Sequence, residues 1–301
     1  MTQPASNAEL FYEAMLFELT KAFALHHTPR SRRLIELIFG KAARSATTVA
    51  MDLDRVIGEG GHAAGARWFL PRFVKSHSVR GVENIPASGP FVIAANHPGS
   101  IDAVVITAHS TRRDLKFIIG DIEFFRHMPH SCEGFIFAPP KEDTAGRMQV
   151  VRESIHHLQD GGGLLIFPRG GIEADPEFMP NADDEFHHWS RSLEIFLKHV
   201  PNLQTLITIV SGVIAPSAMK NPITWFRKKR PDRQRLAFVY QLSRQLLSGK
   251  QLFNLAPRVT FGEIIQGNDH AHSLAEIEHA ARRTLAKHMA WTVVHKSSSD
   301  S

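Results

Sequence analysis

The hydrophobic pattern of this chain changes near residue 77. Before that point, apolar residues such as Leu10, Phe11 and Ala14 recur every three or four positions, which predicts amphipathic helices over residues 8–73. A glycine cluster near residue 60 interrupts the helical pattern. From the change onward, short apolar runs alternate with helical stretches, as expected of an α/β protein. The pattern therefore predicts an α/β fold with an N-terminal helical region.

Six apolar runs in the later part have the length and composition of buried strands. They span residues 91–95, 117–119, 134–138, 164–167, 206–210 and 258–261. Helical patterns cover residues 146–159, 191–199 and 273–289, the last of which opens with a capping box from Ser273 to Glu276. We expect a mixed central sheet flanked by helices over residues 76–295, a helical region over 1–75 and a disordered polar tail over 296–301.

The first strong apolar run, Phe91–Ala95, ends abruptly at a polar turn that contains His97. Open α/β sheets bind their ligands at the carboxyl ends of strands, so this histidine is a candidate functional residue. Asp102 follows in the first turn of the next predicted helix, which either Ser100 or Asp102 can cap. A histidine with a carboxylate on one ring nitrogen can act as a general base. Alternatively, Asp102 is an ordinary helix cap and His97 an ordinary loop residue.

The stretch Asn96–Asp102 (NHPGSID) resembles the Asn-His-x4-Asp block of the glycerolipid acyltransferase family, which includes the lysophosphatidate and glycerol-phosphate acyltransferases. Four further stretches resemble later segments of this family and occur in the family's order. They are residues 116–134, 161–171, 206–216 and 259–264. The resemblance spans about residues 78–266 and identifies the predicted 76–295 domain as an acyltransferase domain.

The resemblance implies that the protein moves a fatty acyl chain from a thioester to a hydroxyl group of a lipid. In this mechanism His97 deprotonates the acceptor hydroxyl, Asp102 holds the imidazole ring, and no covalent enzyme intermediate forms. The donor is acyl-CoA or acyl carrier protein. Asn96, Gly99 and Ser100 are expected to border the substrate, with backbone N–H groups of the Gly99–Ser100 turn as candidate oxyanion donors. Two alternatives remain: a catalytically silent lipid-binding protein, and a thioester or lipid hydrolase.

The third block lies at residues 161–171, and its loop is expected to contact the substrate. The candidate residues are Phe167, Pro168, Arg169, Gly170 and Gly171. Glycines that follow a strand allow backbone N–H groups to approach an anion, although a tight turn with no ligand explains them equally well.

Two departures from the family pattern concern the acceptor. Arg169 stands where the family has a glutamate, and the usual arginine of the second block is missing, with Lys141 nearby. Glu173 could supply the lost carboxylate. In the family these positions hold the acceptor's phosphate and hydroxyl groups. We therefore expect a lipid acceptor other than a glycerol phosphate, within phospholipid or glycolipid biosynthesis.

Composition suits a protein that meets anionic lipids. The 301-residue chain carries a formal charge of +5, which favours lipid head groups, acyl carrier protein or coenzyme A as partners and is too small to indicate nucleic acid. Cys132 is the single cysteine, so the chain forms no internal disulfide and is compatible with a reducing compartment. No signal peptide or membrane-spanning run is recognisable. We expect a cytoplasmic protein that attaches peripherally to the membrane surface.

A basic and aromatic stretch is the candidate membrane contact. Its residues are Trp225, Phe226, Arg227, Lys228, Lys229 and Arg230. Aromatic rings suit the interface, and each basic residue near an anionic membrane contributes about 1 kcal/mol. The alternative is a solvated loop.

His127, His130 and Cys132 are spaced like zinc ligands, but no second ligand pair with zinc-type spacing lies nearby in the sequence. We therefore expect no metal and no cofactor, with the acyl thioester as a co-substrate.

Overall fold

The computed structural model describes residues 5–267 and 273–299, and it forms two compact units. The first unit comprises Met1–Lys75, Asp121–Gly134 and Ile214–Leu255. The second comprises Ser76–Gly120, Phe135–Val213 and Ala256–Ser301. Each unit is therefore assembled from segments that are separated in the sequence.

The second unit is built on a seven-stranded sheet with the order β1-β7-β6-β2-β5-β3-β4. The strands are β1 (Ser78–Arg80), β2 (Phe91–Ala95), β3 (Leu115–Gly120), β4 (Phe135–Ala138), β5 (Gly163–Ile166), β6 (Gln204–Ser211) and β7 (Arg258–Gln266). All neighbouring strands run parallel except β6 and β7, which are antiparallel. The sheet is mixed, which confirms the predicted fold class.

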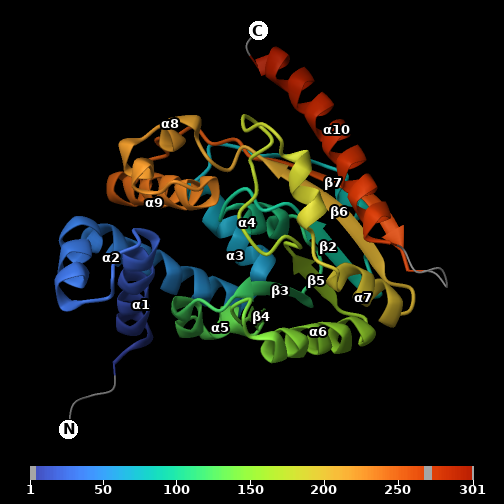
Figure 1. Ribbon diagram of the computed structural model, residues 1–301, viewed down its shortest axis with the longest axis horizontal. Coiled ribbons are helices and arrows are strands. Elements are labelled where there is room, and N and C mark those ends of the chain that lie inside the picture. The colour runs from blue at the N-terminus through green and yellow to red at the C-terminus, as the bar shows by residue number, and fades with distance from the viewer. Residues whose placement is uncertain (1–4, 268–272, 300–301) are drawn as a thin grey trace. The chain divides into compact units, whose positions relative to one another are not determined.

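Helices α6 (Thr144–Gln159), α7 (Ser192–His199) and α10 (Leu274–Ser299) pack on the sheet of the second unit (Figure 1). Their apolar residues share one core cluster with Val92 and Ala94 of β2. Successive side chains of a strand point to opposite faces, so Phe91 and Ile93 face the other side. All five residues of β2 are buried. A strand covered on both faces has to be apolar at every position, which explains the uninterrupted run in the sequence.

The parallel pairing decides where the functional loops meet. Strand β2 lies between β5 and β6, and all three run in the same direction. Their carboxyl ends therefore meet at one edge of the sheet, where α/β proteins bind ligands. The loop that follows β2 carries His97, and the loop that follows β5 carries Phe167.

The first unit is helical. It contains α1 (Asn7–Ala22), α2 (Pro29–Gly60), α3 (His62–Phe69), α5 (Pro129–Cys132), α8 (Pro216–Met219) and α9 (Arg230–Ser248). Thr28 caps α2 with its side chain, and Gly61 ends it with φ +80°, a conformation that favours glycine. Apolar faces of α1 and α2 form the core of this unit, including Leu16 and Phe39.

The remaining helices are short. The second unit contains α4 (Asp102–Ala108), and short 3₁₀ helices occur in both units. They are η1 (Leu70–Arg72), η2 (Val82–Asn84), η3 (Glu123–His127), η4 (Asp183–His188) and η5 (Pro222–Phe226).

All six predicted strands are present, with ends that differ by a few residues, and the Ser273–Glu276 capping box is formed. Strand β1 and helix α9 were not predicted. Neither Ser100 nor Asp102 caps α4, because Ile101 occupies the N-cap position. Helix α10 continues past residue 289 to Ser299, and the last two residues of the predicted tail lie outside the described residues.

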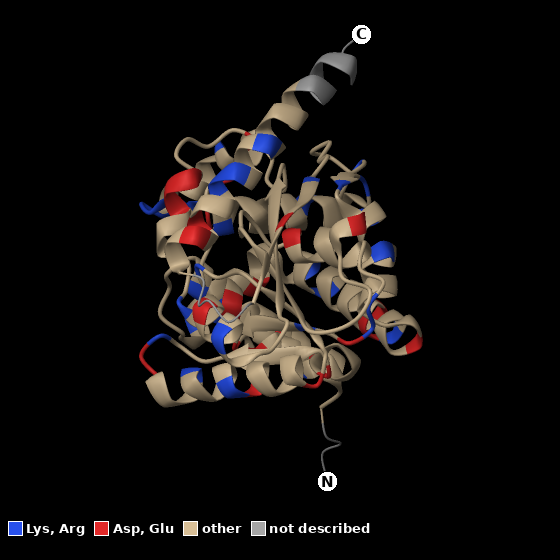
Figure 2. Ribbon diagram, turned by 90° about the vertical axis from the view of Figure 1, so that its right-hand side faces the viewer, with Lys and Arg blue, Asp and Glu red and all other residues tan. Residues whose placement is uncertain are grey.

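Acidic and basic residues occur close together along the helices (Figure 2). On α10, Arg282 pairs with Glu278, and Arg283 pairs with Glu263 of β7. Among the residues that the structure describes, no helix combines the length and the apolar character that crossing a bilayer requires.

Candidate active site

The structure brings His97 and Asp102 together. The Nδ1 atom of His97 lies 2.9 Å from Oδ2 of Asp102. Because an ionised carboxylate only accepts hydrogen bonds, Nδ1 carries the proton and donates it. The lone pair of the neutral ring is then on Nε2, which is the arrangement that a general base requires. The His97 side chain is 25% exposed, whereas the Asp102 side chain is fully buried.

Backbone amides hold the Asp102 carboxylate from its other sides. The N–H of Gly99 donates to Oδ2 at 3.0 Å, and the N–H of Ala103 donates to Oδ1 at 2.7 Å. Gly99 was predicted as an oxyanion donor, but its N–H points to Asp102, so it stabilises the carboxylate. The adjacent Ser100 is exposed.

Phe167 joins the third block to this site. Its ring stacks on the imidazole of His97 with 4.3 Å between the ring centroids and an angle of 27° between their planes. Such contact between flat rings restricts the rotation of the imidazole. Asp102 and Phe167 therefore fix the His97 ring from its edge and from its face.

Glu173 lies behind His97 and is 1% exposed. Its Oε2 accepts the backbone N–H of His97 at 2.6 Å, and its own N–H donates to the His97 carbonyl at 2.7 Å. The indole N–H of Trp189 donates to Oε1 at 3.0 Å. Burial raises the pKa of the Glu173 carboxyl from 4.5 to about 7, although the N–H donors and nearby His97 oppose this rise. Glu173 was predicted to contact the substrate, and the structure places it against the backbone of His97.

Asn96 was also expected to border the substrate, but it is 3% exposed. Its amide donates to the carbonyl of Val210 at 2.9 Å and accepts the Val210 N–H at 2.7 Å. The side chain thus continues the pairing between β2 and β6 beyond the end of β2. This anchors the residue immediately before His97.

Arg169 pairs with a carboxylate of this chain. Its Nε donates to Oε2 of Glu185, which belongs to η4. The Arg169 side chain is 24% exposed and the Glu185 side chain 12%. The charge of Arg169 is therefore balanced within the protein.

Of the other residues that were predicted to contact the substrate, Lys141 lies after β4 and the rest occupy the turn after β5. Pro168 accepts the N–H of Ser190, and Gly170 adopts φ +65° and donates to the carbonyl of Phe167. Gly171 follows in the same turn. Lys141 is exposed in the turn after β4.

The predicted membrane residues belong to the first unit. Trp225 and Phe226 end η5 and are 69% and 74% exposed. Lys228 and Lys229 are exposed as well. By contrast, Arg227 pairs with Asp232 at 2.8 Å and donates to the carbonyl of Ala22.

This basic stretch is not one loop, because Arg230 begins α9. Its side chain donates to Gln234 within that helix. The predicted basic cluster is therefore divided between a short linker and a helix.

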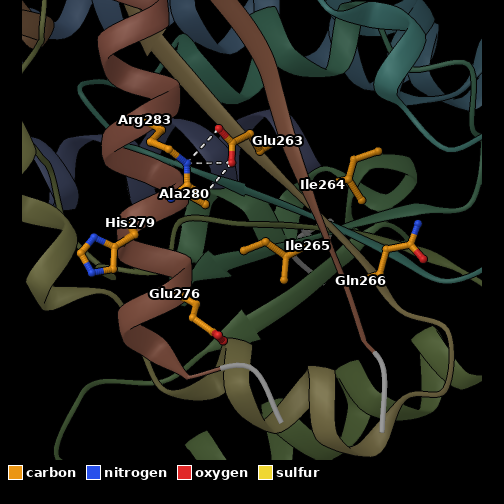
Figure 3. Close-up of a pocket in the computed structure, with 8 residues that line it drawn as sticks. All are labelled: Glu263, Ile264, Ile265, Gln266, Glu276, His279, Ala280 and Arg283. Atoms are coloured by element: carbon orange, nitrogen blue, oxygen red, sulfur yellow. Dashed lines mark hydrogen bonds and ion pairs between the residues drawn. The ribbon is translucent and has the colours of Figure 1, made fainter. Parts of the chain in front are cut away.

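A separate hollow of about 410 Å³ lies between β7 and α10 (Figure 3). Arg283 and Glu263 form an ion pair across it, and Glu276 and His279 lie farther along α10. None of the predicted site residues lines this hollow. Within residues 5–267 and 273–299, no group of three or more histidine, cysteine or acidic side chains is arranged to hold a metal ion.

Residues 76–201 match the family model described as Acyltransferase. This segment is therefore similar to the acyltransferase family. The match includes the Asn96–Asp102 block and the third block, and it confirms the resemblance found in the motifs. The chain is also similar to a solved structure, the 1-acyl-sn-glycerophosphate (LPA) acyltransferase PlsC from Thermotoga maritima. That similarity has 14% identity and a TM-score of 0.46, and it covers 93% of this chain and 95% of the other. No curated protein sequence shows significant similarity.

Several residues around the candidate site carry no signal in the sequence. Trp189 and Glu185 lie in or next to η4, many residues after the third block. No spacing rule connects them with His97 or Arg169, since only the folding of η4 onto the loop after β5 brings them together. Tryptophan with a buried N–H needs an acceptor, but the sequence does not say which one.

Proposed function

We propose that this protein transfers a fatty acyl chain from a thioester to a hydroxyl group of a lipid, with His97 as general base. The observation that carries the proposal is the His97–Asp102 pair within a segment of the acyltransferase family. The donor is acyl-CoA or acyl carrier protein, as the motif resemblance implies.

The steps follow from the tautomer of His97. Nε2 takes the proton of the acceptor hydroxyl, and the resulting oxygen nucleophile attacks the thioester carbonyl. The new C–O bond forms while the C–S bond breaks, and the proton passes from Nε2 to the leaving thiolate. Asp102 stabilises the imidazolium that exists between these two events.

We further propose that the acceptor does not present a phosphomonoester to Arg169. A phosphate needs unbalanced positive charge, and Arg169 is already paired with Glu185. A polar head group without a terminal phosphate, such as that of a glycolipid or an aminolipid, suits this neutral pair. Lysophosphatidate should accordingly be a poor acceptor.

We also propose that the protein attaches to anionic membranes through the first unit. Trp225 and Phe226 are exposed next to Lys228 and Lys229, a combination that suits the interface of a bilayer. Exposed Leu37 of α2 adds apolar surface to the same unit, being 84% exposed.

The activity is tested by incubating labelled acyl-CoA and labelled acyl carrier protein with the enzyme and a panel of hydroxylated lipids. Appearance of label in a lipid supports the proposal. Release of free fatty acid at the same rate with and without lipid indicates a hydrolase. Lipid binding with neither reaction indicates a silent member of the family.

Membrane attachment is tested by flotation with vesicles that contain anionic lipids. The double variant Lys228→Gln, Lys229→Gln should bind more weakly and with a flatter salt dependence. A control with the same loss of charge is Arg147→Gln, Arg152→Gln, because both arginines are exposed on α6. Equal binding by the two double variants would contradict the attachment.

A further inference from the structure

Glu173 makes two contacts with the backbone of His97, one through its side chain and one through its main chain. The carboxylate accepts the His97 N–H at 2.6 Å, and the Glu173 N–H donates to the His97 carbonyl at 2.7 Å. Both polar groups of the His97 main chain are thus held by one residue. Asp102 holds the ring separately.

The carboxylate also has a defined electrostatic setting. Charged groups that act on Glu173 include His97, from the loop after β2, and Glu185, from η4. Glu185 is in turn paired with Arg169.

We infer that Glu173 is a positioning residue, whose ionised carboxylate fixes the main chain of His97 during acyl transfer. This inference rests on the proposed function, and it adds a second carboxylate behind the base. It also makes the active form dependent on two ionisations, of His97 and of Glu173. Because burial raises the pKa of Glu173 to about 7, the second ionisation falls near neutral pH.

The geometry provides a specific substitution test. Two N–H groups donate to the carboxylate, that of His97 and that of the Trp189 indole, and each faces a different oxygen. A glutamine side chain has one accepting oxygen and one NH₂ group, so Glu173→Gln leaves one buried N–H facing another donor. Adding Trp189→Phe removes the second donor, and the amide can then turn its oxygen to His97.

Glu173→Gln should lower kcat by roughly tenfold to a hundredfold and leave KM nearly unchanged, because the base is displaced while the substrate contacts remain. The Trp189→Phe, Glu173→Gln double variant should recover to within about threefold of Trp189→Phe alone. On the acid side, log(kcat/KM) of the wild type should approach a slope of about 2 against pH, and that of the double variant a slope of about 1.

Asp175→Asn is the matched control. Asp175 is a buried carboxylate two residues away that accepts the N–H groups of Gly212 and Val213. Its loss should weaken the fold but keep the slope of about 2, because it does not bond to His97. Loss of kcat in Glu173→Gln without recovery in the double variant, or an unchanged slope, would overturn the inference.

An NMR titration separates this inference from the proposed function, since it needs no turnover. The ¹³C carboxyl signal of Glu173 and the amide signal of His97 should share one transition near pH 7. Glu173→Gln should remove this transition from the His97 amide signal, and Asp175→Asn should preserve it in both signals. A shared transition in a protein without transferase activity would contradict only the proposed function. An active enzyme without the shared transition would contradict only the role of Glu173.

Discussion

Two histidines of the second unit have hydrogen-bonded rings and different surroundings. His97, at the end of β2, bonds to the carboxylate of Asp102 and is 25% exposed. His288, on α10, bonds through Nε2 to Ser211 and through Nδ1 to Thr260, and its exposure is 0%. Burial and the nearby Arg80 lower the pKa of His288 to about 3.

The difference separates a histidine that suits the proposed role of general base from one that supports the fold. Hydroxyl partners satisfy a neutral ring but give an imidazolium no compensating charge, so His288 stays neutral and joins α10 to β6 and β7. A carboxylate partner and a partly exposed side chain suit His97 to the proposed role of general base. Hydrogen bonds alone do not indicate catalysis; the charge of the partner and the access to the ring decide it.

The largest effect should come from His97→Ala. Removing the general base should lower kcat/KM by at least about two orders of magnitude. The free energy of unfolding should change little, because the ring is partly exposed. Steady-state acyl transfer and urea unfolding measure the two effects. Near-normal turnover in a folded variant would exclude His97 as the base, and Asp102→Asn should show a smaller loss with an intact fold.

His288→Ala should produce the reverse result. Removing the ring leaves a cavity and takes the imidazole partner from the buried Ser211 hydroxyl, whereas Thr260 still accepts a hydrogen bond from Arg80, and this should cost about 3 kcal/mol of unfolding free energy. Turnover of the folded fraction should stay within about twofold of the wild type, measured well below the unfolding temperature. A hundredfold loss of turnover in folded His288→Ala would contradict the structural role of His288 and its difference from His97.

The pH dependence of stability should also separate the two regions, with opposite signs. The pKa of His288 is about 3 in the folded protein, below its ordinary value of 6.5. As pH falls below 6.5 the unfolded chain takes up a proton that the folded one does not, so the free energy of unfolding falls by about 1.4 kcal/mol per pH unit. The folded pKa of Glu173 is about 7, above 4.5, so stability is lost as pH rises between these values, by about 3 kcal/mol.

These slopes can be separated by urea unfolding at pH 5 and pH 8. The stability of His288→Gln relative to the wild type should be higher at pH 5 than at pH 8. The stability of Glu173→Gln relative to the wild type should be higher at pH 8 than at pH 5. Parallel stability curves for the wild type and either variant would show that the buried group does not titrate differently on folding.

The smallest effect concerns the Arg169–Glu185 ion pair. Changing its charges tests whether this pair affects activity at the site around His97. Arg169→Glu places two carboxylates together and should lower activity with the native acceptor by about tenfold. The charge-swapped double variant, Arg169→Glu with Glu185→Arg, should recover most of it. Efficient use of lysophosphatidate by the wild type, undiminished in Arg169→Glu, would show that this pair does not set acceptor choice.

Local pattern was sufficient for most elements of the sheet. The run Phe91–Ala95 is apolar throughout because β2 is covered on both faces, and the strand prediction was therefore correct. Strand β1 has only three residues, too few for a periodic signal, and it exists because it pairs with β7. Helix α9 begins with basic residues that suit either a helix or a loop, and packing within the first unit decides between them.

The site was predicted only in part, for a similar reason. His97 and Asp102 were expected to lie within reach of each other, because a strand end and the next helical turn are only a few residues apart. The neighbours of Asn96 and Glu173 lie far away in the sequence. Both residues were expected at the substrate, and both instead hold the backbone around the site.

Local sequence was sufficient to predict the strand–turn–helix that carries the His97–Asp102 pair, because that geometry depends on short-range contacts and on a strong apolar pattern. Which charges are balanced and which polar groups are buried depends instead on the packing of distant segments. Arg169 met Glu185, Glu173 met His97 and Trp189, and His288 met Ser211 only when distant segments packed together. Partner choice and desolvation depend on long-range packing, because they are set by segments that lie far apart in the sequence.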